Sequence, residues 1–261
     1  MDELPIDSNT VNKALDIASE STKEIRKEID KAGAKGVNKL AQLLWASPIG
    51  RKADLYIAER SYKMQKALEE MQAKYQKIPE KNRVEPSSYI ALKGVTELTY
   101  ALDEDYLKEA FENILISDMD NRKKRNVLPS YIEIVKQLSQ NDAILLKFFK
   151  EQNIKNEPII KPKYIFENGG FIYASNNIGL LYNEDYIILS AIVLDNLSRQ
   201  KLIEINFDEY RHNTTIYDKA FEKIKLCDEF QRLPDNAKLG YSKGLLKTTS
   251  FGQNFIDICI S

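Results

Sequence analysis

Hydrophobic residues recur at helical spacing through residues 1–80. From Val11 to Ala32 they stand four and three positions apart in alternation, with one polar member, and mostly Lys, Glu, Asp and Ser lie between them. A stripe this narrow, with a period of about 3.5 residues, predicts an amphipathic helix that packs against one neighbour. That neighbour is either another helix of the chain or a second copy of it. A second long amphipathic helix is predicted over Leu55 to Gln76.

The middle of the chain carries repeated signals for the starts of helices. Pro86 and Pro129 suit first turns, Asp103 is a candidate N-cap, and Ser139 to Asp142 has the pattern of a capping box. Hydrophobic residues three or four positions apart follow each signal. Short helices with short links are therefore expected to pack into a compact bundle.

Strand signals begin after Glu151. Two apolar runs, Tyr164 to Phe166 and Phe171 to Tyr173, flank the turn residues Glu167 to Gly170 and predict a β-hairpin. Further along, the pattern predicts a helix, a strand, a second helix, a second strand and a last helix capped by Thr249 or Ser250. The ranges of the first four are Tyr186 to Lys201, Leu202 to Phe207, Ile216 to Phe230 and Leu245 to Thr248.

The order of a helix followed by two strands is that of a winged-helix unit. The sequence thus predicts a mainly α protein: a helical bundle with a small winged-helix-like α/β part at its C-terminal end. We expect three domains. They are long amphipathic helices over residues 1–80, a compact helical core over 81–150, and the winged-helix-like part with its hairpin over 151–261.

Charge and composition narrow the function. Of 261 residues, 38 are Lys or Arg and 39 are Asp or Glu, so the net charge of −1 does not make the whole surface attractive to nucleic acid. The acidic N-terminus lacks the apolar segment of a signal peptide, and no apolar run is long enough to span a membrane. We expect no transmembrane segment and a cytoplasmic location, which fits two widely separated cysteines.

One stretch could place the protein at the periphery of a membrane. The apolar residues from Leu40 to Ile49 are flanked by basic side chains, a combination found in helices that lie on a membrane surface. The alternative is a buried helix with charged flanks. The flanking residues are Lys35, Lys39, Arg51 and Lys52.

The residue inventory argues against catalysis. The single histidine, His212, lies in a polar stretch, and the two cysteines are Cys227 and Cys259. Nucleophilic catalysis needs a nucleophile beside a base, and metal centres of the usual kinds need several His or Cys ligands. No glycine-rich loop that would cradle a phosphate is present. We therefore expect no enzymatic activity, no metal and no cofactor.

Two charged segments lie between the predicted second and third helices of the core. Asp118 and Asp120 resemble the start of a calcium loop, but the following positions do not fit one, and a solvated turn is predicted. The cluster Arg122, Lys123, Lys124 and Arg125 is a candidate anion-binding site for phosphates or lipid headgroups. A solvated loop is the other interpretation of this cluster.

Several stretches of the middle segment resemble the abortive-infection alpha family of bacterial proteins linked to phage resistance. They are Val84 to Pro86, Leu98 to Leu102, Phe111 to Leu115 with Asp118 to Asp120, Leu128 to Ser139 and Asp142 to Leu146. Weaker similarity extends from Ala53 to Gln76, from Leu194 to Ile203 and from Thr249 to Cys259. The resemblance implies a role in halting phage propagation, through harm to the infected cell, and it brings no active site with it.

The functional hypothesis is a non-enzymatic phage-defence protein that acts by binding a host or phage protein, with a homo-oligomer through the N-terminal helices left open. A nucleic-acid-binding regulator is an alternative, but the helix Tyr186 to Lys201 offers few suitable side chains. Asn196, Arg199, Gln200 and Lys201 are offset by Asp185 and Asp195. A membrane-surface effector is the third alternative.

Overall fold

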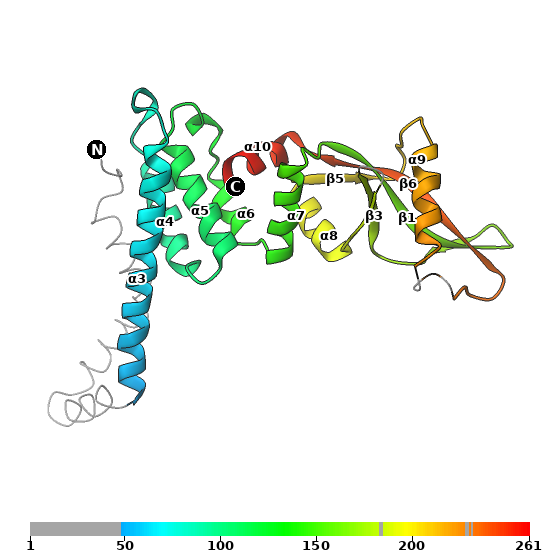
Figure 1. The fold of residues 1–261 in the computed structure, drawn as a ribbon, viewed down its shortest axis with the longest axis horizontal. Coiled ribbons are helices and arrows are strands. Elements are labelled where there is room, and N and C mark those ends of the chain that lie inside the picture. Colours follow the sequence, from blue (N-terminus) through cyan, green and yellow to red (C-terminus); the bar gives the residue numbers. More distant parts are fainter. Residues whose placement is uncertain (1–47, 183–184, 228–229, 231) are drawn as a thin grey trace. The chain divides into compact units, whose positions relative to one another are not determined.

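The computed structural model describes residues 48–182, 185–227, 230 and 232–261, which divide into two compact units (Figure 1). Unit 1 comprises the described residues up to Gln137 together with Ser261, and unit 2 runs from Leu138 to Ile260. The stripe from Val11 to Ala32 and residues 40–47 of the apolar stretch lie outside the described residues. The helix pairing and membrane contact expected there stay predictions.

Unit 1 is helical. Its α-helices are α3 (Pro48–Gln76), α4 (Ser88–Tyr100), α5 (Asp105–Asp118) and α6 (Ser130–Val135). Helix α3 includes the helix predicted over Leu55 to Gln76. Its buried side chains, Met64, Ala67, Met71 and Tyr75, recur three or four residues apart. Tyr62, which the sequence pattern places on this stripe, is 69% exposed instead.

Helices α4 and α5 form the centre of unit 1. Leu98, Ile114 and Leu115 are fully buried between them. A Cβ at Gly94 would lie 2.8 Å from Leu115 Cδ2, so the missing side chain lets the two helices approach closely. Asp103 is not the N-cap of α5, because Glu104 occupies that position.

Unit 2 is built on an antiparallel sheet. The order along it is β4-β3-β1-β6-β5, and β2 pairs with β1 off this path. The strands are β1 (Asn156–Phe166), β2 (Phe171–Tyr173), β3 (Ile178–Tyr182), β4 (Asp185–Leu189), β5 (Ile203–Asn206) and β6 (Ala237–Thr248). Strand β1 pairs with β6 along its whole length, from Asn156 opposite Lys247 to Phe166 opposite Ala237.

Four helices belong to unit 2: α7 (Gln140–Glu151), α8 (Ala191–Arg199), α9 (Thr215–Ile224) and α10 (Ser250–Cys259). Helix α9 packs on one face of the sheet, with Tyr217 and Ile224 buried against Ile160 and Leu181. The predicted capping box of α7 is confirmed, since Ser139 Oγ accepts from Asp142 N and Asp142 Oδ2 accepts from Ser139 N. Thr249 caps α10 as predicted.

The predicted hairpin is also confirmed. Tyr164 lies opposite Ile172, and Ile165 lies opposite Phe171. The connecting turn places Gly169 at a φ of 81°, a conformation that side chains disfavour and glycine adopts freely. The strand that carries the first half of the hairpin begins earlier than the sequence pattern indicated, at Asn156.

The predicted fold class is wrong. Unit 2 contains a six-stranded antiparallel sheet, so the protein is a mixed α/β fold and not a mainly α bundle with a winged-helix-like part. The apolar run that begins at Tyr186 forms strand β4 against β3, and a helix starts only at Ala191. A short apolar run satisfies both a strand and a buried helix, and pairing with Ile178 to Tyr182 decides the matter. The helix predicted over Tyr186 to Lys201 is thereby reduced to α8, whose Leu194 and Leu197 are buried.

Candidate functional site

The cluster from Arg122 to Arg125, hereafter the basic loop, lies between α5 and α6 and is held by hydrogen bonds. Arg122 Nε donates to Asp120 Oδ1 at 2.9 Å, and its terminal nitrogen donates to Asp120 Oδ2 at 2.5 Å. The hydrogen bond from Arg122 keeps the pKa of Asp120 below its usual range. Lys124 Nζ donates to the backbone oxygen of Glu85. Half of the basic loop is therefore occupied by contacts within unit 1.

Lys123 and Arg125 are the other half of the basic loop. Both are exposed, and neither forms an ion pair within the part of the chain that the structure describes. Two such cations can contact at most a small anion, because each phosphate contact uses one basic side chain. The loop offers less to an anion than its sequence indicates.

The two aspartates before the basic loop are not solvated, contrary to the prediction. The Asp118 side chain accepts hydrogen bonds from Ser87 N at 2.6 Å and Ser87 Oγ at 2.7 Å, and it is 2% exposed. Asp120 is 3% exposed and pairs with Arg122. Both carboxylates therefore hold loops of unit 1 together. Their protein partners take the place of the water that the sequence pattern predicted around them.

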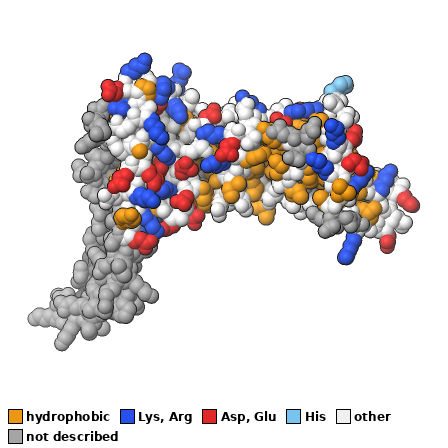
Figure 2. Space-filling view, viewed as in Figure 1, with side chains coloured by type: hydrophobic (Ala, Val, Ile, Leu, Met, Phe, Trp, Pro, Cys, Tyr) orange, Lys and Arg blue, Asp and Glu red, His pale blue; other side chains and the backbone are white. Residues whose placement is uncertain are grey.

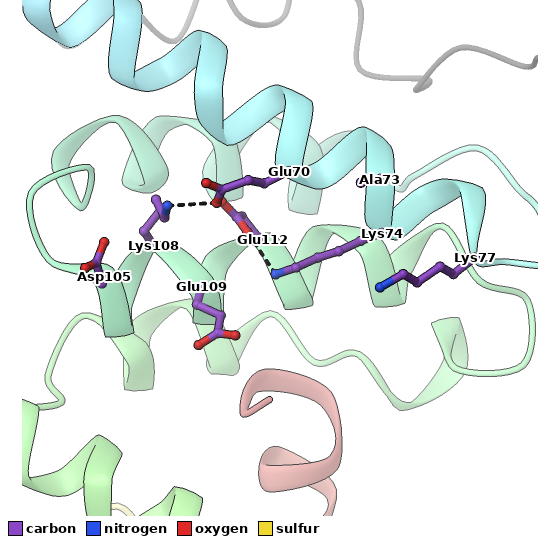
Figure 3. A pocket seen from close by; sticks show the side chains of 8 residues that line it. All are labelled: Glu70, Ala73, Lys74, Lys77, Asp105, Lys108, Glu109 and Glu112. Carbon is purple, nitrogen blue, oxygen red and sulfur yellow. Dashed lines mark hydrogen bonds and ion pairs between the residues drawn. The ribbon is translucent and has the colours of Figure 1, made fainter.

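A depression between α3 and α5 brings together more charged side chains than the basic loop does (Figure 3). It has a volume of about 420 Å³. Side chains one helical turn apart line it from both helices. Helix α3 contributes Glu70, Ala73, Lys74 and Lys77, and α5 contributes Asp105, Lys108, Glu109 and Glu112. We call this site the charged depression.

Two ion pairs cross the charged depression from helix to helix. Lys108 Nζ is 2.8 Å from Glu70 Oε2, and Lys74 Nζ is 2.8 Å from Glu112 Oε2. Lys74 Nζ also donates to Asn113 Oδ1 at 2.9 Å. Figure 3 shows these two pairs side by side between the helices, and it draws no partner for Lys77.

The two carboxylates of these pairs differ in environment. Glu112 is 1% exposed and its Oε1 has no hydrogen-bond partner among the described residues. Burial raises the pKa of its carboxyl group, and Lys74 only partly opposes this effect. The hydrogen bond from Lys108 lowers the pKa of Glu70, which is more exposed. The pair of Lys74 and Glu112 thus links the two helices through a buried carboxylate, and we call it the latch. The pair of Lys108 and Glu70 lies nearer the surface.

The charged depression was not predicted from the sequence. Its acidic and basic residues stand at positions that a helix pattern assigns to solvent, and its two halves are about forty positions apart. One signal was present: Lys74 and Lys108 each stand one helical turn from acidic residues on their own helices. That signal cannot show which helices pair.

The residues considered for catalysis are not brought into a catalytic arrangement. His212 is exposed in a loop, and Cys227 and Cys259 are not joined in a disulfide bond. Cys259 is 1% exposed, and burial raises its pKa well above the usual value, so it stays protonated at neutral pH. The described residues hold no group of three or more His, Cys, Asp or Glu placed to bind a metal ion. Among the described residues, no helix is both long and apolar enough to cross a membrane.

Comparison with known families decides the relationship of the chain. The model of the family described as abortive infection alpha matches residues 59–259, which include nearly all of both units. The protein belongs to the abortive infection alpha family. This membership confirms the resemblance carried by the middle segment and suggests a role in abortive infection and phage defence. No curated protein and no solved structure matches the chain significantly.

The family match covers much more of the chain than the basic loop. The match spans α4 to α10, so it covers the helical core, the charged depression and the sheet of unit 2. It also includes α3 from residue 59 onward, the part of that helix that carries Glu70 and Lys74. The family match therefore includes residues of both units.

Proposed function

We propose that this abortive infection alpha protein reduces phage yield by binding a host or phage protein in the cytoplasm, without turning over a substrate. Family membership carries the defence role in this proposal. The binding mode is supported by the character of the charged depression, which is open and lined by side chains of both signs. Figure 2 shows basic and acidic side chains interspersed over the helices of unit 1, a surface suited to a partner with complementary charges.

The rim of the charged depression is the first candidate for the interface. Lys77 and Glu109 line it, and within the described part of the chain neither side chain forms a hydrogen bond or an ion pair. Their charges can therefore be paired by a partner at no cost to contacts inside unit 1. The paired residues Lys74 and Glu112 beneath them keep the two helices in register.

The absence of turnover is proposed from the placement of the reactive groups. The only imidazole, that of His212, is exposed in a loop, and a general base needs a pocket that shifts its pKa. The Cys259 thiol is buried and protonated, so it is a poor nucleophile. The free state of both cysteines is usual in the cytoplasm.

The test is the efficiency of plating of a broad phage panel on cells that express the protein. Wild type is expected to lower plating for at least some phages. The charge swap Lys77→Glu with Glu109→Lys keeps the net charge and is expected to abolish protection. The matched control is Lys123→Ser with Arg125→Ser in the basic loop, which is expected to keep it.

A second arm tests whether chemistry is involved. The triple variant His212→Ala, Cys227→Ala and Cys259→Ala is expected to protect as well as wild type when circular dichroism shows a native fold. Unchanged plating by wild type across the panel would contradict the defence role. Loss of protection in the folded triple variant would contradict a mechanism based on binding alone. Loss in the basic-loop control with protection kept in the charge swap would move the interface to the basic loop.

A further inference from the structure

One end of the sheet in unit 2 exposes aromatic rings beside lysines. Strand alternation places Lys161, Lys163 and Ile165 of β1 on the same face. The hairpin register sets Tyr173 opposite Lys163 and Phe171 opposite Ile165, so both rings share that face. On the other side of β1, Lys238 of β6 lies opposite Ile165. We call Lys161, Lys163, Phe171, Tyr173 and Lys238 the aromatic–lysine surface.

This face is the one that α9 leaves uncovered. Ile160, which precedes Lys161, is buried under α9, so the neighbouring lysines point to the opposite side of the sheet. Phe171 is 49% exposed and Tyr173 is 42% exposed. In Figure 1 the hairpin of β1 and β2 extends beyond the helices of unit 2. The two rings lie next to each other, and an exposed apolar patch of this kind is a candidate interaction site.

Two of the three lysines of this surface lie against its rings. Lys161 Nζ lies 4.2 Å from the centre of the Tyr173 ring, and Lys163 Nζ lies 4.4 Å from the centre of the Phe171 ring. Within the described residues, none of the three lysines of the surface forms an ion pair. The contrast with unit 1 is clear, because Lys74 and Lys108 are each neutralised by a glutamate.

We propose that the aromatic–lysine surface binds single-stranded nucleic acid. An unpaired nucleotide carries a flat base and a negative phosphate, and the surface offers a ring and an ammonium group a few ångströms apart. The Phe171 and Tyr173 rings are 5.6 Å apart and meet edge to face, so they suit two bases that are splayed and not stacked on each other. A duplex hides the base faces that such rings need.

The local charges favour nucleic acid over a membrane surface. A hairpin that enters the lipid interface needs apolar residues at its tip. Here the tip is Glu167 to Gly170, which is polar, exposed and carries an acid. The three lysines lie behind the tip, along the strands, where a chain of phosphates can pass.

The proposal is tested with the purified full-length protein, and it does not depend on the defence role. Fluorescence anisotropy measures binding of labelled oligo(U), oligo(dT) and a duplex of the same length. Oligo(U) and oligo(dT) separate RNA from DNA as the source of the strand. Both single strands, or one of them, are expected to bind more tightly than the duplex. If all three lysines contact phosphates, the logarithm of the association constant should fall with the logarithm of salt concentration with a slope of about −2.

Variants of the rings give the sharpest arm. Phe171→Ala and Tyr173→Ala are each expected to weaken binding about tenfold or more, the usual loss for a stacked base. The matched control is Ile172→Ala, since Ile172 lies between the two rings in sequence, is 53% exposed and points to the opposite face. It is expected to bind within about twofold of wild type.

Variants of the cations test the electrostatic part. Lys161→Gln and Lys163→Gln are each expected to make the salt slope shallower by about 0.7. Lys123→Gln with Arg125→Gln in the basic loop is expected to leave it unchanged. The proposal is overturned if no single strand shows saturable binding, if the duplex binds as tightly, or if Ile172→Ala loses as much as the ring variants. Binding to anionic vesicles with none to oligonucleotides overturns it in favour of a membrane surface.

Discussion

Replacing Lys74 with Met tests the latch between α3 and α5. Lys74 Nζ lies 2.8 Å from Glu112 Oε2, and the Glu112 side chain is 1% exposed, so the variant leaves a buried carboxylate without its cation. Breaking a buried pair in this way costs about 3–5 kcal/mol. Lys74 is itself 27% exposed, and the carboxyl group can take up a proton, so the cost is smaller here. We expect Lys74→Met to lower the free energy of unfolding by about 2–3 kcal/mol near pH 8.

The dependence on pH follows from the direction of the pKa shift. Burial raises the pKa of Glu112 above its ordinary value of 4.5, while the hydrogen bond and charge of Lys74 lower it. The folded state therefore holds this proton more tightly than the unfolded state. Protonation of Glu112 therefore adds to the free energy of unfolding. This contribution is fully present below the pKa of Glu112 in the unfolded state, and it is lost as the pH rises through its pKa in the folded state. Without Lys74 the folded pKa rises further, so the cost of the variant should shrink as pH falls from about 8 to about 5.

Urea denaturation followed by circular dichroism measures this cost at both pH values. The matched control is Lys108→Met, whose partner Glu70 is 37% exposed, and its cost should not exceed about 1 kcal/mol. Adding Glu112→Gln to Lys74→Met should recover most of the loss, because a neutral amide needs no cation. A cost below about 0.5 kcal/mol, an equal cost at both pH values, or no recovery with Gln would refute this account of the latch.

Two further predictions concern packing. A Cβ at Gly252 would lie 1.9 Å from the backbone oxygen of Leu202. Gly252→Ala should therefore destabilise unit 2 by about 3 kcal/mol or more, measured as a lower thermal midpoint. A midpoint equal to that of wild type would contradict the close approach of α10 to the start of β5. The stripe from Val11 to Ala32 should pack on one other helix, so Ile25→Asp with Ile29→Asp should lower thermal stability or change the hydrodynamic size in light scattering. If neither quantity changes, the stripe is not a packing surface.

The parts of the fold that the sequence predicts correctly are those decided by neighbouring residues. The capping box at Ser139 and the hairpin turn at Gly169 each depend on contacts within a few positions, so their residue types suffice. The same applies to Thr249 at the start of α10. Hydrogen bonds between residues a few positions apart can be predicted from the residue types at those positions.

The parts that were missed depend on distant partners. Residues 186–189 are apolar at every position, which fits a buried helix as well as a strand, and only pairing with β3 selects the strand. The first half of β6 does alternate, with Ala237, Leu239 and Tyr241 as its apolar positions, but the alternation is short and includes Gly240, and only the register with β1 shows that this segment is a strand. The fold class was therefore predicted wrongly because it depends on which strands pair, and the pairing partners lie far apart in the sequence.

The candidate sites follow the same rule. Asp118 and Asp120 look solvated in sequence, but their hydrogen-bond donors, Ser87 and Arg122, remove them from water. The aromatic–lysine surface was missed too, because the predicted strand Tyr164 to Phe166 leaves out Lys163, and only the observed register sets Lys163 opposite Tyr173. The charged depression could not be predicted, since no pattern in α3 shows that it faces α5.

The position of β6 in the sheet has a consequence for synthesis of the chain. Strand β6 lies between β1 and β5 and is the last strand to be made, so neither neighbour has its full set of backbone partners until Thr248 has emerged. At usual translation rates, β1 waits roughly 5–15 seconds for β6. The helices of unit 1 are complete long before that. A nascent chain thus carries its charged depression first, and its sheet, with whatever that sheet binds, only when synthesis is nearly finished.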